Sequence, residues 1–322
     1  MPAEINASKS YDLSGGALKE DLRDIIYDIS PMDTVFLTRA GRGTAKSTTH
    51  EWLTDSLGAP AKNAKIEGDT FSANARTLPS RLKNYTQIAR KEFEVTGTSQ
   101  RVDNAGMREL LAYHTARAAK EIKRDMEKDL LSDEPASAGG STAARVSAGA
   151  EAWIYAPNHI SVNQTGATTT APVSGFATSP VTDGSATAFT ETGLRDMLSK
   201  AWSAGGEVDT ILCSSTIYNK ISQFTGLATR FRDVQSRAQA QIIGAADVYV
   251  SAFGSHNIVL SRYCRSGTVF ALDMKTWEVA YLRPFQTIEI AKVGDSERRM
   301  LLAEYTLVAK SPRANTKATN MQ

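Results

Sequence analysis

A long amphipathic stripe runs through residues 104–131. Apolar side chains, together with one histidine, recur there every three or four residues, which is the spacing of one buried helix face. The stripe consists of Met107, Leu110, Leu111, His114, Ala118, Ile122, Met126 and Leu130. Charged residues fill the other faces, so the pattern predicts a helix capped by Asp103 and ended before Pro135. At 1.5 Å per residue it would be about 42 Å long, which suits a flat or elongated body.

A coiled coil is the alternative interpretation of this stripe. The charges at the flanking heptad positions are not sustained over enough heptads to specify a partner helix. A single long helix that spans a flat or elongated body is therefore preferred.

A shorter amphipathic helix is predicted over residues 16–29, with Ser14 as its cap and Pro31 after its end. Its apolar stripe includes Ile25 and Ile26. The residues before it are too few and too polar to form a domain. This part of the chain is interpreted as an arm that needs an apolar partner elsewhere, such as another subunit.

Residues 38–89 have little helical period and are rich in Gly, Ala, Thr and Lys. Weak alternation at 47–53 and 80–88 favours a long, poorly packed excursion of two strands. A loop of this length without function would be unusual in a compact domain.

Residues 135–190 form a composition break, because these 56 positions hold only three charged side chains, Arg145, Glu151 and Asp183. Such a segment resembles a linker. Trp153, Ile154 and Phe176 give it apolar anchors, so we expect it to lie on the surface of the body.

A second body follows. Thr190 is predicted to cap a helix closed by Gly205 and Gly206, and a further helix ends at Gly226. Strands are predicted over 209–214, 247–252, 257–263, 268–272, 277–282, 286–291 and 300–308. The mixture lacks a regular βαβ repeat, so the predicted class is α+β.

Composition excludes some classes of protein. The chain has 322 residues, enough for two domains or one elongated one. With 37 basic and 35 acidic side chains its net charge is +2, whereas dedicated DNA-binding proteins usually carry a clear basic excess. No apolar run approaches the length of a membrane helix, and no signal peptide is recognised. The two cysteines, Cys213 and Cys264, are predicted to be buried thiols in a reducing compartment.

No catalytic constellation is evident. Residues 41–47 resemble a phosphate loop, but Ala45 stands where glycine must precede the lysine, which favours a flexible basic turn. His50 and Glu51 begin a zinc motif that lacks its second histidine, and His114 fits a hydrogen-bonded core histidine better than a ligand. We therefore predict no enzyme activity, no metal and no cofactor.

Residues 76–91 contain five basic side chains and no acidic one. This block could contact phosphate, although facing acidic groups of another subunit is at least as good an interpretation. A nucleic-acid-binding protein and an enzyme built from scattered acids, each a small oligomer, stay as alternatives. An arm and an excursion that cannot bury themselves within one chain favour assembly.

The order of these pieces resembles a known family. The resemblance is carried by residues 24–36 (DIIYDISPMDTVF), by Gly41, Gly43, His50, Glu51, Trp52, Asp55 and Leu57, by 95–98 before the long helix, by Trp153 and Ile154, by Trp202, Gly205 and Gly206, and by Leu272, Asp273, Trp277, 282–284, 292–295 and 304–307. They resemble the major capsid proteins of tailed bacteriophages with the Hong Kong 97-type fold, and most closely the SU-ten-like capsid family.

The resemblance implies an organisation. Residues 1–50 would be the N-terminal arm, 51–95 the extended loop, and 96–135 the peripheral domain with its spine helix. Residues 136–189 would be a link or insertion, 190–275 the axial domain, and 276–322 the return strands of the peripheral domain and the C-terminus. The chain would form pentamers and hexamers of an icosahedral head that encloses double-stranded DNA.

The resemblance also implies partners and interface residues. A portal protein, a separate scaffolding protein, a decoration protein and non-specifically contacted DNA are expected partners, in a virion assembled in the bacterial cytoplasm. Some relatives crosslink a loop lysine to an asparagine of another subunit, but we expect no crosslink here. The side chains predicted to lie at subunit interfaces are Ile25, Ile26, Trp52, Asp55, Lys62, Lys65, Arg76, Arg81 and Trp202.

Overall fold

The computed structural model describes residues 34–55, 57–58, 60–70, 78–102, 109–162, 164–224, 248–292 and 294–322. The predicted helix at 16–29, with Ile25 and Ile26, lies outside these residues, as do Asp103 and Arg76. Helices and strands are mixed, which confirms the α+β class. No helix in the described part of the chain is both long and apolar enough to cross a membrane.

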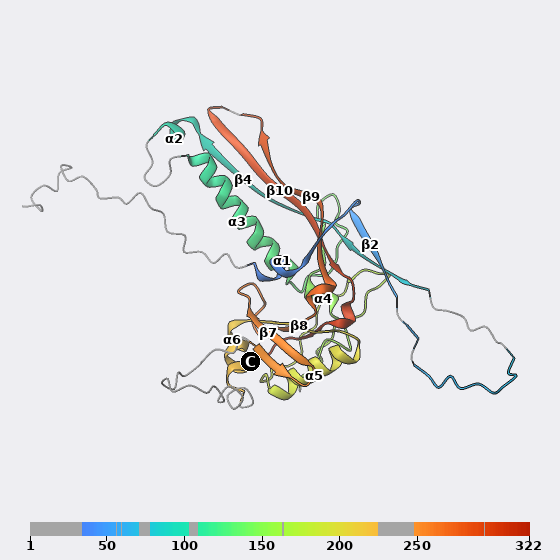
Figure 1. The fold of residues 1–322 in the computed structure, drawn as a ribbon. Helices are drawn as coiled ribbons and strands as arrows, with labels where there is room; N and C mark the ends of the chain where they lie inside the picture. The colour runs from blue at the N-terminus through green and yellow to red at the C-terminus, as the bar shows by residue number, and fades with distance from the viewer. Residues whose placement is uncertain are drawn as a thin grey trace, which may run out of the picture.

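The upper body in Figure 1 is built on a four-stranded sheet in the order β1-β9-β10-β4. Its strands are β1 (Gly41–Thr44), β9 (Trp277–Ile290), β10 (Ser296–Ala309) and β4 (Gln87–Thr96). Strand β1 runs parallel to β9, and the other pairs are antiparallel. The predicted flexible turn at 41–47 was therefore wrong for its first residues, because their backbone pairs with 278–281. The two strands predicted at 277–282 and 286–291 are one strand, which bulges opposite Glu304.

The long helix is α3 (Leu110–Leu130), and it packs along β4 (Figure 1). It begins later than predicted, with Glu109 as N-cap, and ends before Pro135 as predicted. Its 21 residues are about 31 Å long. The stripe is deeply buried towards the C-terminal end, where Ile122 and Met126 are inaccessible to solvent. Two short helices flank the layer, α1 (Val35–Arg39) and α2 (Gly97–Arg101).

The lower body contains a five-stranded sheet in the order β11-β8-β5-β7-β6. Its strands are β5 (Thr210–Cys213), β6 (Val248–Ser251), β7 (Gly254–Leu260), β8 (Val269–Leu272) and β11 (Thr316–Ala318). Helices α5 (Glu191–Ser203) and α6 (Ser215–Ser222) belong to this body, and the 3-10 turns η2 (Met274–Thr276) and η3 (Pro312–Ala314) flank the long hairpin of β9 and β10. Because β11 pairs with β8, the end of the 276–322 segment returns to the five-stranded sheet.

The ends of α5 follow the sequence signals closely. The Thr190 hydroxyl accepts a hydrogen bond from the Gly193 N–H at 3.3 Å. At the other end Gly205 has a φ of 85°, and its N–H donates to the Trp202 carbonyl while the Gly206 N–H donates to Ala201. This is the hydrogen-bond pattern in which glycine ends a helix, so both predicted caps are confirmed.

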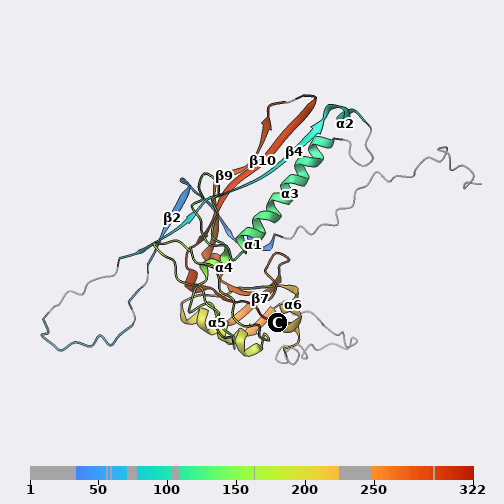
Figure 2. The same ribbon diagram turned by 180° about the vertical axis from the view of Figure 1, so that it is seen from behind.

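The excursion starts from a two-stranded ribbon of β2 (Thr49–Thr54) and β3 (Ser80–Tyr85). Both views show residues 60–70, which lie between these strands in sequence, projecting away from the two bodies (Figure 1 and Figure 2). The prediction of a two-stranded excursion is confirmed, but β4 directly after it belongs to the four-stranded sheet.

The charge-poor segment at 135–190 is partly buried in the core, although its composition resembles that of a linker. Trp153 and Ile154, at the end of α4 (Ala150–Trp153), are inaccessible to solvent, so these two predicted anchors are buried in the core. The small side chains of Ala148, Ala150 and Ala152 are buried with them, and they let the backbone pass close to the core. The same segment reaches both bodies, since Ala148–Ile154 lie in the first core cluster and Ile160 in the second.

Candidate assembly surfaces

The excursion beyond β2 and β3 exposes large apolar side chains. Leu57, Ile66 and Leu78 are 98%, 84% and 84% accessible. Lys62 and Lys65, two of the predicted interface residues, are exposed on the same segment. Isolated exposed apolar side chains are ordinary, but three on one projecting segment point to a surface that is covered by something else.

The base of the excursion is fixed to its own subunit. The Trp52 indole N–H donates to the Ala309 carbonyl at 2.9 Å, and its ring lies 5.3 Å from that of Trp153. Trp52 is half-buried against the core, so it has a role within the subunit. Asp55, just beyond β2, is exposed.

The basic block at 76–91 is largely neutralised within the chain. Glu51 forms ion pairs with Arg81 and Lys83, both at 3.2 Å. Lys91 pairs with Asp125 at 2.7 Å, and Arg90 with Glu92 at 3.3 Å. The alternative in which this block binds nucleic acid loses support, because Arg81, Lys83, Arg90 and Lys91 are each paired with an acid outside the block.

Trp202 lies at a second exposed site, on the lower body. It is 62% accessible, and its ring lies 5.9 Å from that of Phe253. The two rings line a hollow of about 250 Å³ that also includes Glu207 and His256. The His256 ring nitrogens contact the Val208 carbonyl at 2.7 Å and the Ser251 hydroxyl at 2.8 Å, and desolvation lowers the pKa of this histidine.

Comparison with known proteins shows which family this chain belongs to. The model of the SU10 major capsid protein family matches residues 5–322. The chain belongs to this family. Its similarity to the major capsid protein of Escherichia phage Phieco32 is 28% identity over 338 residues, which covers 95% of this chain and 94% of that protein. The resemblance inferred from sequence order is thereby confirmed.

Solved structures with the same fold are also phage capsids. The chain superposes on the Cyanophage A-1(L) capsid asymmetric unit with a TM-score of 0.67 at 13% identity, covering 94% of this chain and 97% of that one. A chain from the structure of phage G gp27 major capsid proteins and gp26 decoration proteins gives a TM-score of 0.55 at 10% identity, with complete coverage of both chains. The protein is thus a phage major capsid protein of the virion, a structural protein and not an enzyme, and it forms a homo-oligomer.

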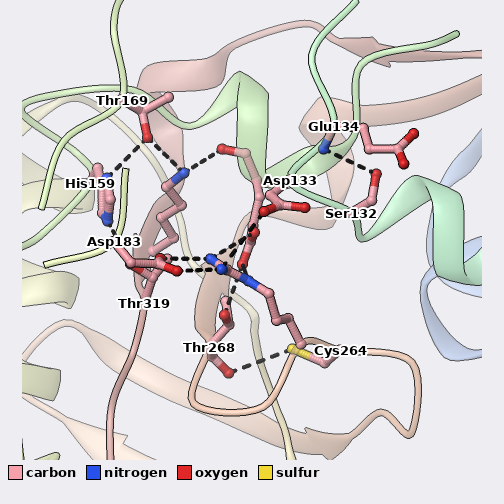
Figure 3. Close-up of polar contacts among 12 residues, drawn as sticks. Ser132, Asp133, Glu134, His159, Thr169, Asp183, Cys264, Thr268 and Thr319 are labelled. Atoms are coloured by element: carbon pink, nitrogen blue, oxygen red, sulfur yellow. Dashed lines mark hydrogen bonds and ion pairs between the residues drawn. The ribbon is translucent and has the colours of Figure 1, made fainter. Parts of the chain in front are cut away.

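A partly buried ionic cluster, which we call the junction cluster, joins distant segments of this capsid protein (Figure 3). It consists of Glu151, His159, Asp183, Arg265 and Lys317 together with the threonines that they contact. The Arg265 guanidinium holds both oxygens of Asp183, at 2.5 and 2.8 Å, and lies 3.1 Å from Oε2 of Glu151. The other oxygen of Glu151 accepts from the Thr268 hydroxyl at 2.8 Å.

Lys317 lies on β11 at the centre of this cluster and is inaccessible to solvent. Its ammonium donates to the Glu151 carbonyl at 2.5 Å and to the Thr169 hydroxyl at 2.9 Å. Desolvation lowers the pKa of Lys317 to about 7 and raises that of Glu151. The same burial, with Lys317 nearby, lowers the pKa of His159 to about 3, so that ring is neutral and bridges Thr169 and Thr319 at 3.0 Å each.

The junction cluster escaped the sequence analysis, but a signal was present. Arg145, Glu151 and Asp183 are the only charges in the 56-residue segment, and each forms an ion pair with a residue far along the chain. Arg145 pairs with the buried Glu304 at 2.6 Å. The three charged side chains of this otherwise uncharged stretch therefore marked positions that form ion pairs with distant parts of the chain.

Proposed function

We propose that this capsid protein assembles into pentamers and hexamers of an icosahedral head that encloses double-stranded DNA, with the excursion lying across a neighbouring subunit. The observation that carries the proposal is the exposure of Leu57, Ile66 and Leu78 on a projecting segment. Burying each such side chain contributes about 1.5–3 kcal/mol. In a closed ring, the excursion of each subunit would cover one neighbour, and the excursion of another neighbour would cover that subunit.

The proposed roles of the segments follow the two bodies. The four-stranded sheet with α3 would be the peripheral domain, and the five-stranded sheet with α5 and α6 the axial domain around the capsomer centre. Residues 1–50 would be the arm and 51–95 the extended loop. The junction cluster, which lies where segments of the two bodies meet, would hold them at a fixed angle.

Other proteins are proposed as partners of the shell. The family resemblance supports a portal protein and a separate scaffolding protein, and the phage G structure, which includes gp26 decoration proteins, supports a decoration protein. The shell is proposed to be held without covalent crosslinks through Lys62 or Lys65. A denaturing gel of purified particles would then show only monomer-sized chains, whereas a ladder of multimers would contradict this part.

Gradient sedimentation of the purified full-length chain, with electron microscopy of the fast fraction, tests the proposal. Closed shells, sheets or tubes are expected from the native sequence. The triple variant L57S/I66S/L78S should keep the secondary structure of the subunit and lose the fast fraction. The conservative variant L57M/I66V/L78M, which keeps apolar surface, is the matched control and should assemble. Normal particles from the serine variant would contradict the role of the excursion.

A further inference from the structure

A tight turn in the charge-poor segment contacts the base of the excursion. The backbones of Val173 and Phe176 bond to each other twice, with nitrogen-to-oxygen distances of 2.9 and 3.0 Å. The two residues between them have positive φ angles, 51° at Ser174 and 90° at Gly175, as in the type I′ turns of tight hairpins. We call residues 173–176 the clasp.

The clasp contacts strand β3 of the ribbon through its backbone. Strand β2 pairs along one edge of β3, and the Lys83 N–H of β3 donates to the Gly175 carbonyl of the clasp at 2.8 Å. A Cβ atom added at Gly175 would clash with the backbone carbonyl oxygen of Arg81, so the two backbones lie in direct contact. Glycine is therefore required at this position both by its φ and by the close approach of β3.

Side chains strengthen the contact between the clasp and β3. The Phe176 ring stacks on that of Tyr85, with ring centroids 4.5 Å apart, and the Lys83 ammonium lies 5.7 Å from the centroid of the Phe176 ring. Both aromatic residues also pack against the first core cluster. Directly after the clasp, the Ala177 carbonyl accepts from the Ala136 N–H at 2.7 Å. The clasp is thus fixed to its own subunit while it holds the strand.

The ribbon needs such contacts, because two strands alone have little stability. It is also fastened to β10, where the Trp52 indole donates to the Ala309 carbonyl and the Asn84 amide donates to the Leu307 carbonyl at 2.8 Å. Contacts to β10 alone would leave the ribbon free to pivot about that strand. The clasp, which contacts the backbone of β3, opposes this rotation.

The clasp also connects the excursion to the lower body. Asp183, a few residues after Phe176, is held by both its oxygens in the Arg265 guanidinium of the junction cluster. Between them the chain is tied back on itself by a bridge from Thr182 to Thr168. One short stretch of chain therefore contacts the ribbon at one end and the junction cluster at the other.

We propose that the clasp sets the direction in which the excursion leaves the subunit, and that it thereby places Leu57, Ile66 and Leu78 against the neighbouring subunit. The inference deepens the proposed function and rests on it. Residues 60–70 project from the ribbon, so a small rotation at its base becomes a larger displacement there (Figure 1 and Figure 2). A folded subunit whose clasp has left β3 would then miss its contact with the neighbour.

A purely local role, in which the turn stabilises only the charge-poor segment, is the rival explanation. The contacts disfavour it. The Gly175 carbonyl accepts from Lys83, and the Phe176 ring stacks on Tyr85, so both are directed at β3. The bonds that the turn needs for its own geometry are those between Val173 and Phe176, and they do not involve β3.

The variant G175A is designed to open the clasp. The added methyl group is strained at this φ and clashes with the Arg81 carbonyl oxygen, so the turn must move away from β3. G166A is the matched control. Gly166 lies in the same charge-poor segment with a φ of 89°, and no heavy atom of the described residues lies within 4 Å of a Cβ added there. Both variants strain the backbone, but only G175A disturbs β3.

A distance between the ribbon and the upper body reports the direction of the excursion. Spin labels are attached to the unassembled full-length chain through L53C, at an exposed position of β2, and K128C, at an exposed position of α3. Cys213 and Cys264 are buried, and burial raises the pKa of both thiols, so they resist labelling. Pulsed electron spin resonance should show a distribution shifted or broadened by several ångströms in the clasp variant and a native one in the control.

Gradient sedimentation of the unlabelled variants connects this geometry with assembly. G175A should reduce the fast fraction several-fold, while the melting temperature of its unassembled chain stays near that of G166A. A native distance distribution in G175A overturns the inference, and so do equal effects of the two variants. Loss of shells without a change in the distance distribution overturns it as well, because the clasp would then act in another way.

A second opening variant covers the case in which G175A does not fold. F176L removes the ring that stacks on Tyr85 and keeps an apolar side chain. It should change the distance distribution in the same direction, and an unchanged distribution overturns the inference. Failure of the native chain to form shells would instead count against the proposed function. The spin-label distances are measured on the unassembled chain, so the two failures are distinguishable.

Discussion

The carboxylate of Glu127 accepts a hydrogen bond from the backbone N–H of Phe36 at 2.7 Å, across 91 residues of sequence. Its second oxygen accepts from the Leu37 N–H at 2.8 Å. These are first-turn N–H groups of α1, which have no partner within their own helix. The buried acid of the long helix therefore anchors the segment that leads from the N-terminal region into the body.

The variant E127Q tests this anchor. The amide keeps one acceptor but presents an NH₂ group to one of the two backbone N–H groups, which leaves buried donors unpaired. We expect a loss of about 1–3 kcal/mol in the free energy of unfolding. Urea denaturation of the unassembled chain, followed by circular dichroism, measures it. E121Q, at a partly exposed position of the same helix, is the control, and an equal loss in both variants would contradict the anchor.

The buried Lys317 predicts a pH dependence of stability. Its pKa is lowered from 10.5 to about 7 by desolvation, so between these values the unfolded chain binds the proton more strongly than the folded one. Stability contributed by this group therefore rises as the pH increases from about 7 towards 10.5, and is lost as the pH falls through that window.

Urea denaturation at pH 7, 8 and 9 compares the native chain with K317M. The variant should show a smaller rise in the free energy of unfolding over this range, because the titrating group is gone. K310M removes an exposed ammonium and should show the same change of the free energy of unfolding with pH as the native chain. A K317M slope as steep as the native one would show that another group controls the dependence.

The parts of this fold that could be predicted are those encoded locally. The α3 stripe and the Thr190 and Gly205 caps are short-range sequence patterns, and the structure contains the helix and both caps that they predict. Strand β4 was only partly foreseen, because its pairing with β10 joins residues more than 200 positions apart, as in Val95 opposite Glu297. Sequence spacing carries no information about such a register.

Burial was the harder property to predict. Trp153 lies within a segment whose composition is that of a linker, and it is buried because distant strands pack around it. Glu151 and Lys317 would be placed on the surface by any residue scale. Each is buried because its partners arrive from other parts of the chain, and that information appears only in three dimensions.

Trp52 is predicted to stabilise the subunit before any assembly occurs. W52F keeps an aromatic ring at this position, but the Ala309 carbonyl loses the indole N–H that donates to it. We expect a loss of about 1–2 kcal/mol in the free energy of unfolding. Denaturation of the unassembled chain measures it, with R81Q in the neighbouring strand as the control for an exposed change. An unaltered W52F midpoint would mean that the indole contact contributes nothing to the isolated subunit.

Trp202 is predicted to behave in the opposite way. Because 62% of its surface is accessible, W202S should change the free energy of unfolding by less than about 1 kcal/mol. If a neighbouring subunit fills the hollow beside Phe253, the same variant should sharply reduce the yield of fast-sedimenting particles. V173S removes another exposed apolar side chain, 56% accessible and outside the predicted interface residues, and should assemble normally. Normal particle yield from W202S with an unchanged melting temperature would remove Trp202 from the assembly interface, whereas a large loss of subunit stability would assign it a role within the fold.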